Sequence, residues 1–248
     1  MLRHRVIPVV LLDGYSVVKT IQFKIRRNLG NPVTVARIYN SRNVDELILL
    51  DIDASKGGRH IDFFTIEDIA SECFMPLTVG GGLTNCDEIE MILKKGADKV
   101  VLNTAALKNP AIIKESSSRF GSQCIVVSVD INKDGGHYSV FSHAGVKNSL
   151  DPIQWCKSIE ELGAGEILIN SVYLDGMMIS YDNSFIKMVS SAVNIPIIAC
   201  GGASNPRDGV DAIRSGASAV AMASMFHFTD YTPQMCRDKM RESNIPVR

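Results

Sequence analysis

One pattern occurs twice in this chain, with a period of 120 residues. Its first copy reads Pro-Leu-Thr-Val-Gly-Gly-Gly at 76–82 and continues as Gly-Ala-Asp-Lys-Val-Val-Leu-Asn-Thr-Ala at 96–105. The second copy reads Pro-Ile-Ile-Ala-Cys-Gly-Gly at 196–202 and Gly-Ala-Ser-Ala-Val-Ala-Met-Ala-Ser-Met at 216–225. Position 76 precedes 196 by 120 residues, and position 96 precedes 216 by the same interval. The sequence therefore predicts a duplicated half, with copies at approximately 1–121 and 122–248.

Both copies contain a short apolar run, then glycines, then a helical pattern, then a second apolar run that ends in small polar residues. Apolar runs without alternation are typical of strands buried on both faces, as in parallel sheets. Glycines just beyond such a strand let backbone N–H groups approach an anion, and the next helix N-terminus favours negative charge. The glycines could instead serve only tight turns. Matching small polar residues at 103–104 and 223–224 favour two phosphate-binding corners.

Eight such apolar runs alternate with helical patterns along the chain. We expect strands at 6–11, 46–52, 75–79, 99–102, 124–130, 166–170, 195–199 and 219–222, and helices starting at 31–32 and spanning 66–73, 87–95, 110–120, 152–162, 184–192, 206–215 and 233–242. This alternation predicts a (β/α)8 barrel, built from two half-barrels within one domain, 1–248. An open doubly wound sheet is the alternative, which two equal four-unit halves disfavour.

Composition excludes several classes of function. The net charge is −1 and no basic run occurs, which argues against a nucleic-acid partner. The six cysteines are scattered, without metal-ligand spacing, so we expect free thiols, no metal and no cofactor. The N-terminal apolar run is broken by Pro8 and Asp13, too early for a signal peptide or membrane span. We therefore expect a cytoplasmic protein.

In such a barrel the βα loops at the carboxyl ends of the strands carry the function. The residues at these ends are small, polar or acidic, and the candidates for substrate and phosphate binding are Asp51, Gly80, Gly81, Gly82, Asn103, Thr104, Asn170, Ser171, Asp175, Gly201, Gly202, Ala223 and Ser224. Asp13 and Asp130 follow strands 1 and 5 and are candidates for acid–base chemistry. The arrangement predicts a doubly phosphorylated substrate stretched across the mouth. Asp51 and Asp175 could equally cap helices or hold loops.

Two further features have two interpretations each. The loop from 13 to 30 carries Lys19, Lys24, Arg26 and Arg27, which suits a lid that closes over phosphates, although a solvated loop would also explain the charges. At the opposite barrel end, strand starts carry two cations and two anions, namely Arg5, Glu46, Lys99 and Glu166. These four residues could form a salt-bridge plug over the core or an adjustable entrance to the barrel axis.

A family resemblance runs along essentially the full length of the chain. The motifs that carry it are Val-Val-Lys at 17–19, Asp-Glu-Leu at 45–47, Thr-Val-Gly-Gly-Gly at 78–82, Gly-Ala-Asp-Lys-Val at 96–100, Asn-Thr-Ala at 103–105, Phe-Gly-Ser-Gln at 120–123, Gly-Ala-Gly-Glu-Ile-Leu at 163–168, Phe-His-Phe at 226–228 and the final Ile-Pro-Val-Arg. The chain resembles the cyclase subunit of imidazole glycerol phosphate synthase, a half-barrel-repeat enzyme of histidine biosynthesis.

The resemblance implies a heterodimer with a glutaminase subunit docked on the N-terminal face. Ammonia would pass a charged gate, matched here by Arg5, Glu46, Lys99 and Glu166. It would then reach a bisphosphorylated ribulosyl aminoimidazole-carboxamide nucleotide, giving imidazole glycerol phosphate and aminoimidazole-carboxamide ribotide. The family's acid–base pair is an aspartate at the end of strand 1 and another at the end of strand 5, assisted by a lysine of loop 1. Asp130 and Lys19 match two of these three.

The strand-1 aspartate does not match, because Leu11 occupies its position. Leucine transfers no proton, and losing one partner of an acid–base pair typically costs ~10²–10⁴-fold in rate. One hypothesis is a cyclase in which Asp13 or Asp53 replaces the missing carboxylate. The other is an ammonia conduit without cyclase chemistry. Residues 19–24 and 49–55 are similar to a second branch of the family, associated with surface polysaccharide (O-antigen) biosynthesis, which is thought to supply ammonia to a sugar-modifying amidotransferase. A related isomerase of the histidine route also needs a strand-1 carboxylate, so Leu11 argues against it.

Overall fold

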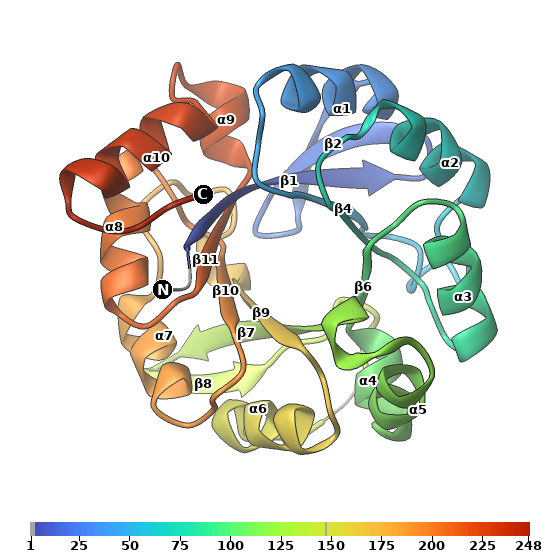
Figure 1. The fold of residues 1–248 in the computed structure, drawn as a ribbon. Coiled ribbons are helices and arrows are strands. Elements are labelled where there is room, and N and C mark those ends of the chain that lie inside the picture. The colour runs from blue at the N-terminus through green and yellow to red at the C-terminus, as the bar shows by residue number, and fades with distance from the viewer. Residues whose placement is uncertain (1–2, 147) are drawn as a thin grey trace.

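The computed structural model describes residues 3–146 and 148–248. Parallel strands close into a ring, and helices surround it (Figure 1). The ring consists of β1 (Arg5–Asp13), β4 (Leu47–Asp51), β5 (Leu77–Gly80), β6 (Lys99–Leu102), β7 (Ile125–Asp134), β9 (Glu166–Ser171), β10 (Ile197–Cys200) and β11 (Ala219–Met222). It closes because β11 pairs with β1 in parallel, with Arg5 opposite Ala219. The predicted (β/α)8 barrel is confirmed, and the open sheet is wrong.

Helices connect successive strands on the outside of the ring. They are α1 (Pro32–Ser41), α2 (Phe63–Glu72), α3 (Cys86–Lys94), α5 (Ala111–Phe120), α6 (Pro152–Glu161), α7 (Asn183–Ser190), α8 (Pro206–Arg214) and α10 (Pro233–Glu242). Most begin at an Asn, Asp or Thr whose side chain accepts a hydrogen bond from a backbone N–H of the first turn, as Asn31 and Asp151 do. Proline occupies the first turn of α1, α6, α8 and α10, where its missing N–H costs nothing.

Two hairpins and four short segments complete the chain. The segment expected as an irregular lid instead forms β2 (Ser16–Ile21) and β3 (Ile25–Gly30), which extend the sheet antiparallel from β1. In the second half, β8 (His137–Val140) pairs with the long β7. The short helices α4 (Thr104–Lys108) and α9 (Ser224–Phe228) follow β6 and β11, and η1 (Ser122–Cys124) and η2 (Val172–Leu174) are single 3-10 turns.

The repeat is visible in the backbone as well as in the sequence. Asn103 and Ala223, 120 positions apart, precede α4 and α9 with similar and uncommon dihedral angles, φ −135° and ψ −83° against φ −126° and ψ −75°. Gly81 and Gly201, also 120 apart, both have positive φ and both lie against the backbone of the preceding strand end. The two halves therefore share one local geometry at the mouth of the barrel.

The apolar interior has two layers, one between sheet and helices and one inside the ring. The inner layer contains Ile7, Val9, Leu11, Val18, Ile48, Val101, Val126, Leu168, Ile198, Ala219 and Ala221. Side chains that alternate along each strand explain this division, since one face of every strand points to the helices and the other to the axis. Between its two polar ends the barrel axis is thus lined with apolar side chains.

Candidate functional site

Four charged side chains meet at the amino-terminal end of the barrel. Arg5 donates to Glu46 Oε2 at 2.6 Å and to Glu166 Oε1 at 2.9 Å. Lys99 Nζ lies 3.3 Å from Glu46 Oε2 and 3.2 Å from Glu166 Oε2. Thr78 donates its hydroxyl to Glu46 Oε1 at 2.7 Å. We call these four charged residues the gate ring, since each cation touches both anions.

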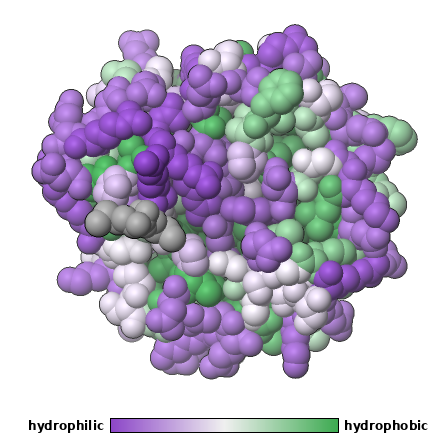
Figure 2. All heavy atoms as spheres, viewed as in Figure 1, coloured by the Kyte–Doolittle hydropathy of each residue, from purple (hydrophilic) through white to green (hydrophobic). Residues whose placement is uncertain are grey.

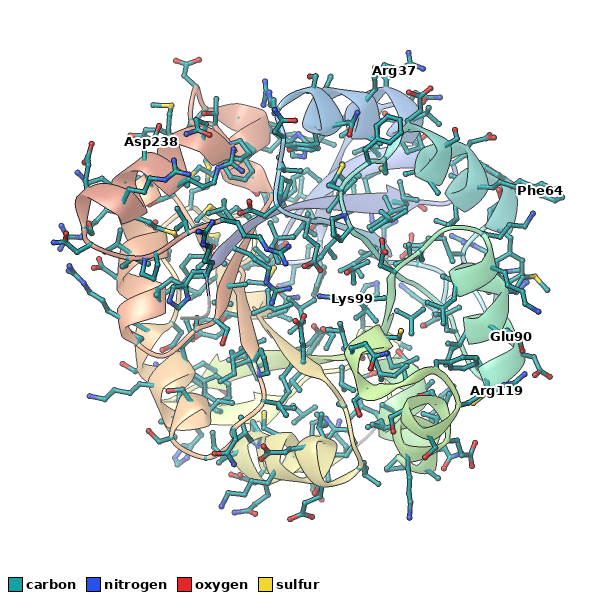
Figure 3. The ribbon with its side chains drawn as sticks, in the orientation of Figure 1. Arg37, Phe64, Glu90, Lys99, Arg119 and Asp238 are labelled. Atoms are coloured by element: carbon teal, nitrogen blue, oxygen red, sulfur yellow. The ribbon has the colours of Figure 1, made fainter. Side chains whose placement is uncertain are left out.

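The gate ring covers the barrel axis. Figure 3 shows Lys99 reaching toward the centre of the barrel, whereas the other labelled side chains lie on the outer helices. In the same view, Figure 2 shows hydrophilic residues over the centre of this face. Glu46 has only 1% of its side chain exposed, so its carboxylate is stabilised by its hydrogen-bond and ion-pair partners and not by water. The structure brings together the four residues that the sequence singled out, and their role as a gate stays a prediction.

A pocket opens at the opposite, carboxyl-terminal end of the strands. Of the predicted residues, those that line it are Lys19, Asp51, Gly80, Gly81, Gly82, Asn103, Thr104, Asp130, Asn170, Asp175 and Ala223. Five others do not line it, namely Asp13, Ser171, Gly201, Gly202 and Ser224. The first predicted phosphate corner thus faces the pocket, while the second contributes Ala223 alone. Apolar side chains form the floor, among them Val9, Leu50 and Leu168.

Asp130 is a buried carboxylate of this pocket. Ser128 Oγ and Asn170 Nδ2 donate to its Oδ1 at 3.1 Å and 3.2 Å. Burial raises the pKa of Asp130 to about 6, and these hydrogen bonds oppose the shift only in part. Among the residues that the structure describes, no Lys, Arg or His lies within ion-pair distance of this carboxylate. Asp130 can therefore exchange a proton close to neutral pH.

Leu11 occupies the position in the first half that Asp130 occupies in the second. Leu11 pairs with Leu50 on β4, and Asp130 pairs with Asn170 on β9. Leu50 and Asn170 are 120 residues apart, so the strand registers alone make Leu11 and Asp130 equivalent. Leu11 is 6% exposed and lines the pocket beside Val9. An apolar side chain therefore stands where a second carboxylate would complete an acid–base pair.

Lys19, on β2, is held by Asp175, which lies in the loop after β9. Its Nζ donates to Asp175 Oδ1 at 3.0 Å, and the hydroxyl of Thr20 donates to Asp175 Oδ2 at 2.7 Å. The backbone N–H of Gln22 donates to the carbonyl of Asp175 at 2.9 Å. Because Lys19 is only 3% exposed, this buried ion pair fixes both side chains. We call the contacts of Lys19, Thr20 and Gln22 with Asp175 the hairpin latch.

The remaining carboxylates around the mouth are engaged by arginines. Arg59 binds both oxygens of Asp51, at 2.6 Å and 3.0 Å, and Asp51 also accepts from the backbone N–H groups of residues 53 and 54. Arg26 donates to Asp13 at 2.8 Å and to both oxygens of Asp53. Hydrogen bonds from Arg26 hold the pKa of Asp53 well below its usual range. The geometry thus supports the loop-holding interpretation for Asp51.

The glycines of both corners permit close approach of backbone to backbone. A Cβ atom on Gly82 would stand 1.9 Å from the carbonyl oxygen of Arg59, and one on Gly202 would stand 2.1 Å from that of Ser180. Gly82 and Gly202 therefore let the preceding βα loop pack directly against the backbone of the corner. This packing accounts for the glycines at 82 and 202, and phosphate binding stays a prediction.

Sequence reasoning missed several pocket residues. Ser128 lies two positions before Asp130 on β7, hence on the same face, and this period-two spacing could have revealed it. Phe23 and His143 come from β2–β3 and from the segment after β8, with ring centroids 5.5 Å apart. No sequence signal connects them, because their contact depends on how the two extensions fold over the mouth.

The described residues contain no cluster of three His, Cys, Asp or Glu side chains arranged to bind a metal ion. Within the same ranges, no helix has the length and apolar character needed to traverse a bilayer.

Comparisons with known proteins agree with this geometry. The model of a family described as "Histidine biosynthesis protein" matches residues 5–232. A protein of Campylobacter jejuni subsp. jejuni serotype O:2, named "Putative imidazole glycerol phosphate synthase subunit hisF2", is 45% identical over 248 residues, covering 100% of this chain and 99% of that protein.

Proposed function

The chain belongs to the histidine biosynthesis protein family, and from this premise we propose that it is a cyclase-type barrel that conducts ammonia but has lost the cyclase reaction. Ammonia would come from a glutaminase subunit bound at the gate ring as a heterodimer. Ammonia would travel along the barrel axis and leave at the mouth pocket. The observation that carries the proposal is Leu11, which replaces the second carboxylate at the mouth.

The axis supports the conduction of ammonia. Neutral ammonia is small and crosses apolar surroundings far more readily than ammonium, since burying an unpaired charge is costly. Ile7, Ile48, Val126 and Ile198 line the axis beyond the gate ring, and none of them offers a hydrogen bond. The gate ring lies between a glutaminase docked on this face and these apolar side chains, so opening the path would begin with the side chains of the ring.

The residues that line the mouth pocket support the proposal that cyclase chemistry has been lost. General acid–base catalysis needs two positioned titratable groups, and Asp130 stands without a carboxylate partner at the equivalent position of β1. Lys19, the expected assistant, is engaged in the hairpin latch. The C. jejuni relative is named as a synthase subunit, and that name is compatible with a branch that retained the scaffold.

A cyclase with displaced acid–base residues is the second candidate. It would need Asp13 or Asp53 to reach the substrate in place of Leu11. Arg26 binds both carboxylates, and neither side chain lines the mouth pocket. A loop carboxylate also positions a proton less accurately than one at a strand end. The geometry therefore favours the conduit over this candidate.

The proposal extends to the ligands and the surroundings of the protein. The corner of Gly80, Gly81, Gly82, Asn103 and Thr104 would bind a phosphorylated small molecule at the mouth. The final ammonia acceptor would be a separate amidotransferase that modifies a sugar of surface polysaccharide, as in the branch that the sequence resembles. We place the complex in the cytoplasm, where glutamine and phosphorylated sugars are available.

A steady-state assay separates the two candidates. Purified protein with saturating ammonium and the histidine-route nucleotide should give negligible imidazole glycerol phosphate. In parallel, the protein mixed with its glutaminase should stimulate glutamine hydrolysis. Cyclisation within the usual enzyme range of ~1–10³ s⁻¹, abolished by Asp130→Asn, would show that the protein is an ordinary cyclase. Failure to bind any glutaminase would contradict the conduit.

A further inference from the structure

Two hydrogen-bond acceptors at the inner end of the mouth pocket have no protein partner. Asp130 receives both of its side-chain hydrogen bonds on Oδ1, from Ser128 and Asn170. No hydrogen bond within 3.5 Å reaches its Oδ2 from the part of the chain that the structure describes, although the Asn103 amide is near enough to the carboxylate to lower its pKa. The second acceptor is Asn170 Oδ1, which is buried and unpaired. Buried acceptors normally find a donor, so this pair points to a ligand that donates.

The orientation of the Asn170 amide follows from its neighbour. An ionised carboxylate only accepts hydrogen bonds, so Asn170 must present Nδ2 to Asp130, which leaves Oδ1 on the other side of the amide. Oδ1 lies beside Gly201, where an added Cβ would come within 3.1 Å of it. Glycine at position 201 therefore keeps side-chain atoms away from this acceptor.

The charge around the two acceptors favours a cation. Asp175 is the carboxylate whose charge acts on Asp130, and it is already neutralised by Lys19 at 3.0 Å. Asp130 itself lies within ion-pair distance of no basic side chain in the described ranges. The pocket thus holds a negative charge whose neighbouring donors, on Ser128, Asn103 and Asn170, are all neutral. A small cation with several N–H groups would satisfy both that charge and the amide oxygen of Asn170.

The position of these acceptors along the barrel axis indicates which cation would bind. From the gate ring inward, the axis is lined by apolar side chains such as Ile48, Val126 and Leu168. Asp130, Ser128 and Asn170 are polar groups at the far end of that apolar stretch and line the pocket into which it opens. Ammonia that has travelled along the barrel axis would meet these three polar side chains as it enters the pocket. Once protonated, it carries four N–H donors and one positive charge.

We propose that Asp130 and Asn170 form a binding site for ammonium, which holds ammonia at the exit of the barrel axis. Ammonium would pair with Asp130 Oδ2 and donate to Asn170 Oδ1. The choice of ammonium as the ligand rests on the proposed function, whereas the two acceptors are observed in the structure and do not depend on it. A site of this kind would delay escape into solvent until an acceptor enzyme occupies the mouth.

The test is a titration of the purified chain, without any partner, by ammonium chloride and by potassium chloride at constant ionic strength. The carboxyl ¹³C signal of Asp130 and the side-chain ¹⁵N signal of Asn170 report binding. Ammonium should produce a saturable shift of both signals that potassium, an ion of similar size without donors, does not produce. Asp130→Asn should abolish the shift at Asn170. Asn170→Leu should weaken binding about tenfold, the equivalent of one hydrogen bond to a charged group.

Asp134→Asn, at the turn between β7 and β8, is the matched control and should leave ammonium binding unchanged. Asn170→Ser replaces Asn170→Leu if the latter does not fold. Equal responses to both salts, or a response that survives Asp130→Asn, would overturn the site. Because the titration uses no glutaminase, it is independent of the proposed function: ammonium binding without ammonia transfer would overturn the conduit alone, and transfer without binding would overturn the site alone.

Discussion

Lys19 and Asp175 are 156 positions apart in the sequence, and their side chains lie 3.0 Å apart in a buried ion pair. This pair ties the β2–β3 hairpin of the first half to the loop after β9 in the second half. The hairpin is otherwise exposed along β3, whose residues are mostly in contact with solvent. The hairpin is therefore held by the pairing of β2 with β1 and by the hairpin latch.

Asp175→Asn should release the hairpin. The substitution leaves the buried Lys19 ammonium without its counter-charge, which favours the open position where Lys19 reaches water. Loss of a hydrogen bond to a charged group is worth about 1.5–3 kcal/mol, so backbone amides of residues 16–30 should exchange with solvent roughly 10–100-fold faster. Hydrogen exchange measures this directly, with Asp134→Asn as the control. Unchanged exchange would show that the hairpin is held by its pairing with β1.

Lys99→Ala should uncouple the two activities of a complex with glutaminase. Arg5 still pairs with both Glu46 and Glu166, although one negative charge is left unbalanced, so the fold should lose about 3 kcal/mol. Without Lys99 the ring no longer closes on its second side, and ammonia should leak or stall at the entrance. Glutamine hydrolysis and ammonia delivery are measured together. Lys94→Ala on the outer face of α3, whose lysine is 73% exposed, is the control. Delivery that ignores Lys99 would contradict the gate.

Leu11→Asp should restore an acid–base pair at the mouth. The new carboxylate would stand at the register position equivalent to that of Asp130, with the pocket between them. Recovery of one partner of such a pair is expected to raise ammonium-dependent cyclisation by ~10²–10⁴-fold over the unmodified protein. Leu11→Asn, similar in shape but unable to transfer the proton, is the control. Equal rates for both variants would mean that more than one residue separates this chain from a cyclase.

Asp130→Asn should stabilise the protein at neutral pH. The pKa of Asp130 is raised by burial from 3.8 to about 6, so the folded state holds its proton more tightly than the unfolded state. Stability from this group is fully present below pH ~4 and is lost as the pH rises through 6, by about 3 kcal/mol in total. Thermal unfolding at pH 7.5 should therefore favour the variant, and the difference should vanish near pH 4. A variant less stable at pH 7.5 would show that Asp130 gains more from its hydrogen bonds than it loses by burial.

Anions should occupy the corner of Gly80–82 with Asn103 and Thr104 in crystals soaked with sulfate or phosphate. The sequence predicts one phosphate corner in each half, but the pocket is not symmetric, since Gly201, Gly202 and Ser224 lie outside its lining. We expect the first corner to fill at lower anion concentration than the second. Crystals in which both corners stay free of anions would contradict phosphate binding altogether.

The barrel was predictable because its signals are local. The strands at 99–102 and 219–222 and the helix at 233–242 begin and end where the apolar runs and capping residues indicate. The β2–β3 hairpin was not predicted, because Arg26, Arg27 and Asn28 make β3 polar and its pairing depends on the neighbouring strand. Alternation between buried and exposed positions, the usual signal for a strand, is absent there.

The candidate site also contains residues that the sequence predicts and residues that it does not. Positions at strand ends, such as Asp130 and Lys99, follow from the barrel and its registers. Partners such as Arg59 for Asp51, or Asp175 for Lys19, depend on how two loops fold against each other. Such contacts have no fixed spacing in the sequence, and no pattern within one loop indicates them.

The register equivalence of Leu11 and Asp130 shows that the two halves now differ at matching positions. Arg5 and Lys99, the cations of the gate ring, both belong to the first half, and Ala219 stands where the second half would repeat Lys99. Asp130, at the register position of Leu11, belongs to the second half. A chain fused from two first halves would carry two copies of Arg5 and Lys99 and no counterpart of Asp130, and one fused from two second halves would have the reverse. On the proposed function, each half would therefore supply a part of the protein that the other half lacks.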